Sequence, residues 1–366
     1  MIKSCDSGSM PFMGNSTKFL EGAKGYGQST SDESIDFFEK SLVDSFVDKL
    51  QAGMDVPNYP QFRDMNQMFV SLMEGIEKID SGYLETKTVS LGAENNKIAE
   101  LLAIERNAQL IQEKIGKPFE LRVCITGPYT LASFFPYRDE KTFIRLGNVI
   151  AQLIECNIFS SKHGKASLVS VDEPTFGLVD DPLIDFGSQG RENLQKAWEK
   201  IFYTIKSKNA QGMIHLHSTA NPMFWDIPSL DVIDTHVDDP IHQMQKTAKL
   251  LESKDKFLKA SMTVNDFDKL IRQKIEVETK EKISETNVNE KIADAWTAIK
   301  KGKIDPEVFL ETADTMKKRV TDIVERFGEE RIPYAGPECG LKGYPTYKNA
   351  LECLRRISAA VSSLKK

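Results

Sequence analysis

The feature that most constrains the fold is a regular alternation of short apolar segments with longer helical ones. Eight segments rich in β-branched or apolar residues end in Gly, Pro or a polar residue, and stretches with helical periodicity separate them. These segments are 2–7, 52–56, 120–126, 167–172, 213–217, 231–237, 257–263 and 332–336. Strands that alternate with helices pair in parallel, and a closed eight-stranded barrel is the commonest solution for a chain of 366 residues. We therefore predict an α/β fold, a (β/α)8 TIM barrel, with a doubly wound open sheet as the alternative.

Two connections are longer than the others. Residues 60–118 are expected to hold two or more helices, and residues 266–305 form a highly charged stretch with apolar residues at partly helical spacing. We interpret 266–305 as an inserted helical hairpin that caps the barrel or packs on a partner. A solvated helical excursion without a role is the simpler alternative. The chain, 1–366, is predicted to be a single catalytic barrel that contains this charged helical insertion.

Charge and cysteine content exclude several classes of function. Lys and Arg total 48 against 54 Asp and Glu, so the net charge of −6 gives no footprint for nucleic acid or an anionic membrane surface. No apolar run approaches the roughly 18 residues that span a bilayer, and the first residues do not resemble a signal peptide. Five cysteines, an odd number, are spread widely. We predict a reducing, cytoplasmic location without nucleic-acid or membrane partners.

Histidines and a cysteine gather where the predicted strands end. In a barrel, the active site lies at the carboxyl ends of the strands. His215 and His217 are two residues apart on one strand, so both side chains project from the same face. His236 ends the next strand, and Cys339 follows the last one.

Imidazole and thiolate are the ligands that zinc favours in a tetrahedral site. A catalytic zinc keeps an open position, where a substrate thiol loses its proton. The sequence thus predicts a zinc site that includes His215, His217 and Cys339, with His236 as a ligand, an acid/base or a supporting residue. The alternatives are a hydrogen-bonded pair of histidines at the barrel mouth and a buried, apolar Cys339.

Two carboxylates and a serine near other strand ends suit an amino-acid substrate. Asp55 and Asp172 are candidates to bind a substrate ammonium through charge-assisted hydrogen bonds. Gly8 and Ser9 are candidates to hold a substrate carboxylate through backbone N–H groups and a hydroxyl. Alternatively, Asp172 only caps the following turn.

Six short motifs together resemble a known family. They are GSMP (8–11), ITGPYT (125–130), VDEP (171–174), HLH (215–217), DVIDTH (231–236) and PECGLK (337–342). Their order resembles the catalytic C-terminal barrel of cobalamin-independent methionine synthase, within a group of barrels that includes uroporphyrinogen decarboxylase. The resemblance implies methylation of the homocysteine thiol to form methionine on a zinc ion held by His215 and Cys339. It implies further that Ser9 contacts the homocysteine carboxylate, while Asp172 and Asp55 bind its amino group.

The chain departs from the family at three positions. His217 stands where the family has a zinc-binding Cys, and His236 stands where it has a zinc-binding Glu. Asn265 or Asp266 replaces a proton-donating His. The family's full-length enzymes also carry a second barrel that helps to enclose the folate.

These departures favour a methylcorrinoid protein over methyl-tetrahydrofolate as methyl donor, because cleavage of a methyl–cobalt bond needs no general acid. Two other readings stay open. One is a methyltransferase that acts on another small thiol, and the other is a non-catalytic barrel that binds a corrinoid protein.

Overall fold

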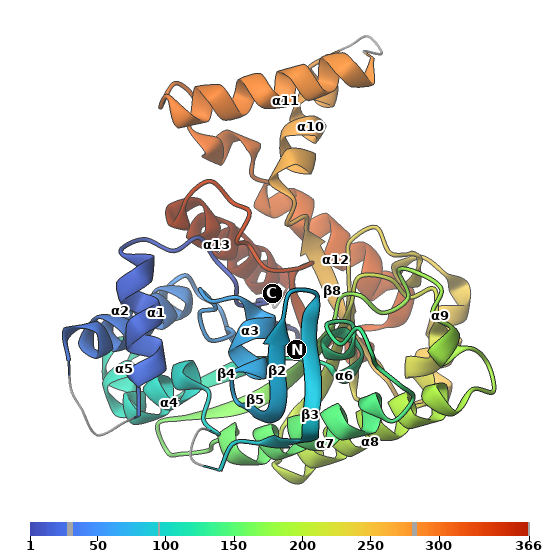
Figure 1. The fold of residues 1–366 in the computed structure, drawn as a ribbon. Coiled ribbons are helices and arrows are strands. Elements are labelled where there is room, and N and C mark those ends of the chain that lie inside the picture. The colour runs from blue at the N-terminus through green and yellow to red at the C-terminus, as the bar shows by residue number, and fades with distance from the viewer. Residues whose placement is uncertain (28–31, 94–95, 280–283, 365–366) are drawn as a thin grey trace.

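The computed structural model describes residues 1–27, 32–93, 96–279 and 284–364. Its main sheet is parallel and has the strand order β1-β9-β8-β7-β6-β5-β4. The strands are β1 (Lys3–Ser4), β4 (Phe119–Thr126), β5 (Gly164–Glu173), β6 (Gln211–Leu216), β7 (Val232–Thr235), β8 (Phe257–Thr263) and β9 (Tyr334–Pro337). The sheet curls into a barrel with helices around it (Figure 1). The predicted α/β barrel is confirmed, and seven of its eight predicted strands are strands of this sheet.

The predicted strand 52–56 is not a regular strand. Val56 N donates to Ser4 O at 2.9 Å, and Arg122 N donates to Pro57 O at 2.9 Å. Parallel bridges at Val56 and Asn58 thereby close the gap between β1 and β4. Proline has no N–H group to give to a ladder. Because Pro57 and Pro60 lie in this segment, the barrel closes here through single bridges instead of a continuous ladder.

Helices surround the barrel. They are α1 (Ser16–Gly25), α2 (Glu33–Gln51), α3 (Met65–Val70), α4 (Ala99–Arg106), α5 (Ala108–Ile115), α6 (Pro128–Ala132), α7 (Thr142–Asn157), α8 (Gln189–Ser207), α9 (Gln245–Ser253), α12 (Ala313–Phe327) and α13 (Tyr347–Leu364). In α8, the Ser188 hydroxyl accepts from Arg191 N as the N-cap, and Leu194, Trp198 and Ile201 bury one face. The described part of the chain contains no helix with the length and apolarity needed to cross a membrane.

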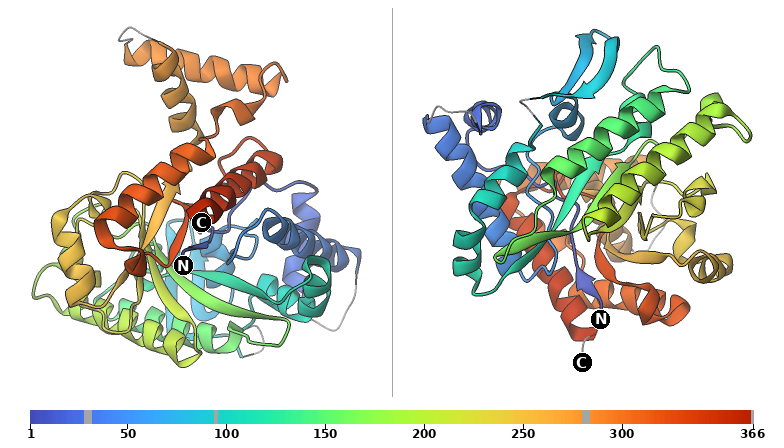
Figure 2. Two further views of the ribbon diagram at one scale, coloured as in Figure 1. Left: turned by 180° about the vertical axis from the view of Figure 1, so that it is seen from behind. Right: turned by 90° about the horizontal axis from the view of Figure 1, so that it is seen from below.

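The connection 60–118 contains the predicted helices and, in addition, a β-hairpin that the sequence did not indicate. The hairpin pairs β2 (Met73–Ile79) with β3 (Gly82–Leu91). Tyr83 N donates to Phe134 O at 2.8 Å, which ties the hairpin to the turn after α6. The hairpin projects from the barrel on the side away from the N-terminus, where the strands end (Figure 2).

Within 266–305, the structure has two helices, α10 (Phe267–Glu278) and α11 (Glu285–Lys300), that form an arm (Figure 1). Ile271 and Ile275 of α10 and Ile292 of α11 are buried and belong to the main apolar core of the protein. The Arg272 guanidinium donates to Glu285 across the two helices. The assignment of the whole chain to one domain stays a prediction.

A buried carboxylate joins a barrel strand to the surrounding helices. Glu173 at the end of β5 accepts from Trp198 Nε1 at 2.8 Å and from the N–H groups of Tyr129 and Thr130 in α6. Burial raises the pKa of Glu173 to about 7, although these donors oppose the shift. The folded protein therefore holds this proton more tightly than the unfolded chain, and stability falls as pH rises from the ordinary glutamate range through 7.

We expect Trp198→Phe to lower the free energy of unfolding by about 2 kcal/mol at pH 8, because it removes a hydrogen bond to a buried carboxylate. The loss should be smaller at pH 5, where Glu173 is protonated. Urea unfolding at both pH values measures this. Trp225→Phe, at a tryptophan that does not bond Glu173, is the control. An equal loss at both pH values would contradict the ionisation of Glu173.

Candidate metal centre

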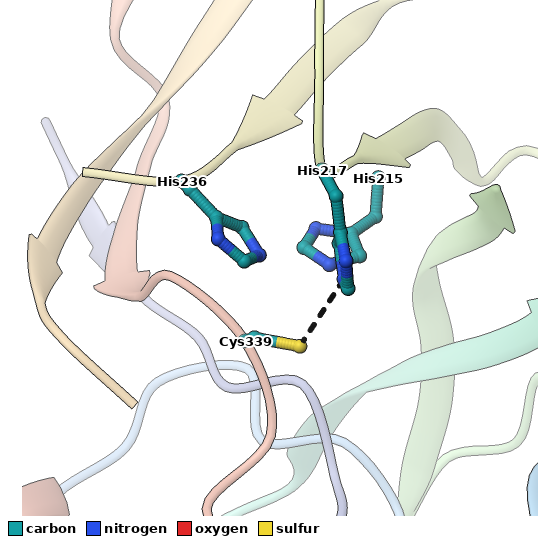
Figure 3. A group of neighbouring side chains, drawn as sticks. All are labelled: His215, His217, His236 and Cys339. Atoms are coloured by element: carbon teal, nitrogen blue, oxygen red, sulfur yellow. Dashed lines mark hydrogen bonds between the residues drawn. The ribbon is translucent and has the colours of Figure 1, made fainter. Parts of the chain in front are cut away.

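Four side chains that lie far apart in the sequence converge at the carboxyl ends of three barrel strands. His215 and His217 come from the end of β6, His236 follows β7, and Cys339 follows β9. Parallel neighbours end at the same edge of a sheet, which places these residues side by side. Figure 3 shows the three imidazoles and the thiol turned toward one another.

The separations suit one metal ion. One ligand atom from each of His215, His217, His236 and Cys339 lies within 4.8 Å of the others. Cys339 Sγ lies 3.7 Å from His217 Nε2, close to the edge of roughly 3.5 Å expected for a sulfur and a nitrogen on tetrahedral zinc. The Nε2 atoms of His215 and His236 are buried without a hydrogen-bond partner. Buried polar atoms are rarely left unpaired, so the donor set fits a metal.

The electrostatics favour a thiolate in this group. Burial alone would raise the pKa of Cys339, but His215, His217 and His236 hold that pKa well below its usual range. Thiolate sulfur is the form of cysteine that binds metal. The group therefore presents one anionic sulfur and three imidazoles.

Beneath the cluster, His215 faces a buried carboxylate. Asp234 Oδ2 lies 3.2 Å from His215 Nδ1. Lys259 Nζ donates to Asp234 Oδ1 at 2.7 Å, and Arg122 donates to Oδ2 at 3.1 Å. Burial opposes the charge of His215, yet Asp234 raises the pKa of its imidazole to about 10. Burial likewise opposes the charge of Asp234, and Lys259 and His215 keep its pKa far below the usual value. A carboxylate in this position orients a metal-binding imidazole.

Asp172 and Ser9, two of the three polar residues predicted to contact the substrate, lie beside the cluster. Asp172 ends β5 in register with His215, accepts from Ser170 Oγ at 2.6 Å, and has its pKa raised by burial. Leu341 N donates to Ser9 O at 2.8 Å. A side chain at Gly340 would meet Ser9 Oγ at 1.8 Å, so glycine is needed there for the Ser9 hydroxyl to lie against the loop that carries Cys339.

The structure does not bring Asp55 to this group. Asp55 Oδ2 accepts from Ser4 N and Ser4 Oγ, and the residue borders a cavity with Lys3 and Glu120, at the opposite end of the strands. The carboxyl end of the closing segment instead carries Gln61, bridged to Ser9. The prediction for Asp55 was wrong in placement, because the segment continues several residues past the predicted strand end.

The loops around the cluster are held by Glu338, another residue that the sequence did not single out. Its carboxylate accepts from Val237 N at 2.9 Å and from Asn265 N at 3.0 Å. These bonds join the segments that follow β7 and β8 to the segment that follows β9. Its position next to Cys339 was the only sequence signal for this role.

One cavity adjoins the cluster. It has a volume of about 470 Å³, and its lining includes His236 and also Trp296 of the α10–α11 arm. A second cavity, of about 710 Å³, lies between the loops that follow β5 and β6 and is bordered by the exposed side chains of Val179 and Phe186. No residue of the cluster lines this second cavity.

Comparisons with known proteins show the fold. Models of protein families give no match to the chain, and a search of curated proteins gives none either. The structure is similar to that of a B12-independent methionine synthase from Shewanella sp. W3-18-1, with a TM-score of 0.59 and 14% identity over 100% of this chain and 98% of that one. A protein from Listeria monocytogenes, proposed to be a vitamin B12-independent methionine synthase, matches with a TM-score of 0.58 and 14% identity, over 100% of this chain and 99% of that one. The resemblance predicted from the motifs is confirmed at the level of the fold.

We expect Asp234→Asn to lower the free energy of unfolding by about 3–5 kcal/mol, because it leaves Lys259 and Arg122 as buried charges without their carboxylate. Equilibrium unfolding in urea measures the loss. Asp255→Asn is the control: its ion pair with Arg331 is exposed and its φ of 49° is one that Asn tolerates, so less than about 1 kcal/mol should be lost. A small loss at Asp234 would show that the network is not held by charge.

Proposed function

We propose that this protein transfers a methyl group to the thiol of homocysteine and forms methionine, with zinc held by His215, His217, His236 and Cys339. The convergence of these four side chains at the barrel mouth carries the proposal. The full-length similarity in fold to B12-independent methionine synthase structures supports it. The proposed location is the cytoplasm.

Each part of the site has a proposed role. A zinc ion bound here would supply a Lewis acid that ionises the substrate thiol at neutral pH, and the thiol would add to the four protein ligands or take the place of one of them. Asp172 binds the ammonium of homocysteine, and Ser9 binds its carboxylate, so that the thiol points toward His215 and Cys339. His236 borders the cavity that leads away from the cluster, which gives it contact with the reacting groups as well as with the metal.

The resemblance offers two methyl donors, a methylcorrinoid protein and methyl-tetrahydrofolate. A folate leaving group takes up a proton, and Asn265 and Asp266 stand where the family has its proton-donating His. A methyl–cobalt bond is cleaved without a proton, which favours the corrinoid. Faster homocysteine methylation from methylcobalamin than from methyl-tetrahydrofolate by the purified protein is the expected result, and the reverse order would contradict it.

Metal content tests the site directly. Protein purified without an affinity histidine tag should carry about one zinc per chain, and Cys339→Ser should lose most of it because the only thiolate of the group is gone. His163→Gln changes a histidine outside the group and should retain the metal. Elemental analysis of the three proteins gives the answer. Absence of zinc from the wild type after reconstitution would leave only a binding role for the barrel.

Substrate binding is tested by two matched carboxylate changes. Asp172→Asn should raise the KM for homocysteine by roughly 10–100-fold, since a hydrogen bond to a charged group contributes about 1.5–3 kcal/mol. Asp55→Asn should leave KM unchanged because Asp55 lies at the other end of the strands. Steady-state kinetics with homocysteine distinguishes the two. An equal rise in KM for Asp55→Asn and Asp172→Asn would contradict the assignment of Asp172 to the ammonium of homocysteine.

A further inference from the structure

The cavity between His236 and Trp296 has an aromatic wall supplied by the α10–α11 arm. Trp296 of α11 lies 5.4 Å, centroid to centroid, from Phe267 of α10, and Phe267 lies 5.4 Å from Tyr344. Trp296 Nε1 donates to Asp268 at 2.6 Å, which fixes the indole in place. The half-buried Trp296 ring thus borders the cavity that His236 of the candidate metal centre also lines.

The same cavity is acidic. Its lining includes the carboxylates of Asp266, Asp268 and Glu338 against the single ammonium of Lys269. The Lys269 ammonium lies 3.9 Å from the carboxylate of Asp238, a residue that does not line the cavity. Asp238 therefore neutralises part of the only positive charge in the lining. An acidic cavity with an indole face is suited to an organic cation, which gains from both the field and the ring quadrupole.

We infer that this cavity binds a small methyl-onium cation, and that such a cation, a methylsulfonium, donates the methyl group in the proposed reaction. The inference rests on the proposed function for the acceptor and adds a donor class that the sequence resemblance does not offer. The cavity of about 470 Å³ is in the range for a small ligand. His236 lines the same cavity, so a cation bound there shares the cavity with a residue of the candidate metal centre.

The chemistry of this donor agrees with the residues present. The homocysteine sulfur forms a bond to the methyl carbon as the carbon–sulfonium bond breaks. The electron pair of that bond stays on the leaving sulfur, which departs as a neutral thioether. No proton is needed on the leaving group, so Asn265 and Asp266 suffice where a proton donor would otherwise be required.

Binding is measured through the fluorescence of Trp296, because Trp198 and Trp225 are 0% and 6% exposed. Trimethylsulfonium is the probe, and tert-butanol is a neutral molecule of similar size. We expect saturable quenching by the cation and none by the alcohol. Quenching by both, or by neither, would overturn the cation site.

Three variants locate the site by calorimetric titration with trimethylsulfonium. Trp296→Leu and Asp268→Asn should each weaken binding by roughly 3–30-fold, the range of a partly desolvated cation–π or ionic contact. Asp268→Asn retains an oxygen that accepts from the Trp296 indole. Asp294→Asn removes an exposed carboxylate from α11, the helix that carries Trp296, and should have no effect on binding. Equal effects at Asp294 and Asp268 would show only nonspecific attraction.

Methyl transfer separates this inference from the proposed function. The supporting result is methionine formed from homocysteine and trimethylsulfonium, with a raised donor KM in Trp296→Leu and an unchanged homocysteine KM. Methionine formed from methylcobalamin but not from the sulfonium would overturn the donor assignment and leave the proposed function intact. Trp296-dependent binding of the cation without methylation of homocysteine by any donor would instead overturn the proposed function.

Discussion

The buried carboxylate of Asp234 is the interaction on which the candidate site depends. It receives Lys259 from β8 and Arg122 from β4, and it faces His215 on β6, so one residue of β7 joins four strands inside the barrel. A buried charge is stable only when it is paired. Because Lys259 and Arg122 both bind this carboxylate, the position of Asp234 beneath the cluster is fixed. Asp234 in turn orients the imidazole of His215.

This network also sets the charge around the thiol. Compared with the family that the motifs resemble, His217 and His236 replace two anionic ligands with imidazoles. Asp234 supplies one negative charge just below His215, but Lys259 and Arg122 already neutralise it. The metal would therefore be more electron-poor, and a thiolate bound to it a weaker nucleophile. A site of this kind is matched to an activated methyl donor, which both a corrinoid and an onium cation provide.

The alternation of strands and helices predicted the barrel, and the convergence of strand ends predicted the grouping of His215, His217, His236 and Cys339. Where prediction failed, the cause was local. An extended chain advances about 3.3 Å per residue, so Asp55, six residues before Gln61, lies roughly 20 Å from the end of the closing segment that reaches the cluster. The hairpin β2–β3 has mostly polar, partly exposed strands and no apolar alternation to reveal it. The roles of Asp234 and Glu338 depend on long-range contacts that local patterns do not contain.

The charged stretch 266–305 shows why position in the topology can matter more than composition. Its polarity is typical of a solvated excursion, and most of its surface is indeed exposed. It follows β8, however, and a segment that follows a barrel strand begins at the face where the strand ends gather. Phe267 therefore packs on Tyr344 at the mouth, and Trp296 packs on Phe267. By this route an aromatic ring from the insertion lines the same cavity as His236, so the insertion can affect which molecule approaches His236, while the strands set which side chains surround it.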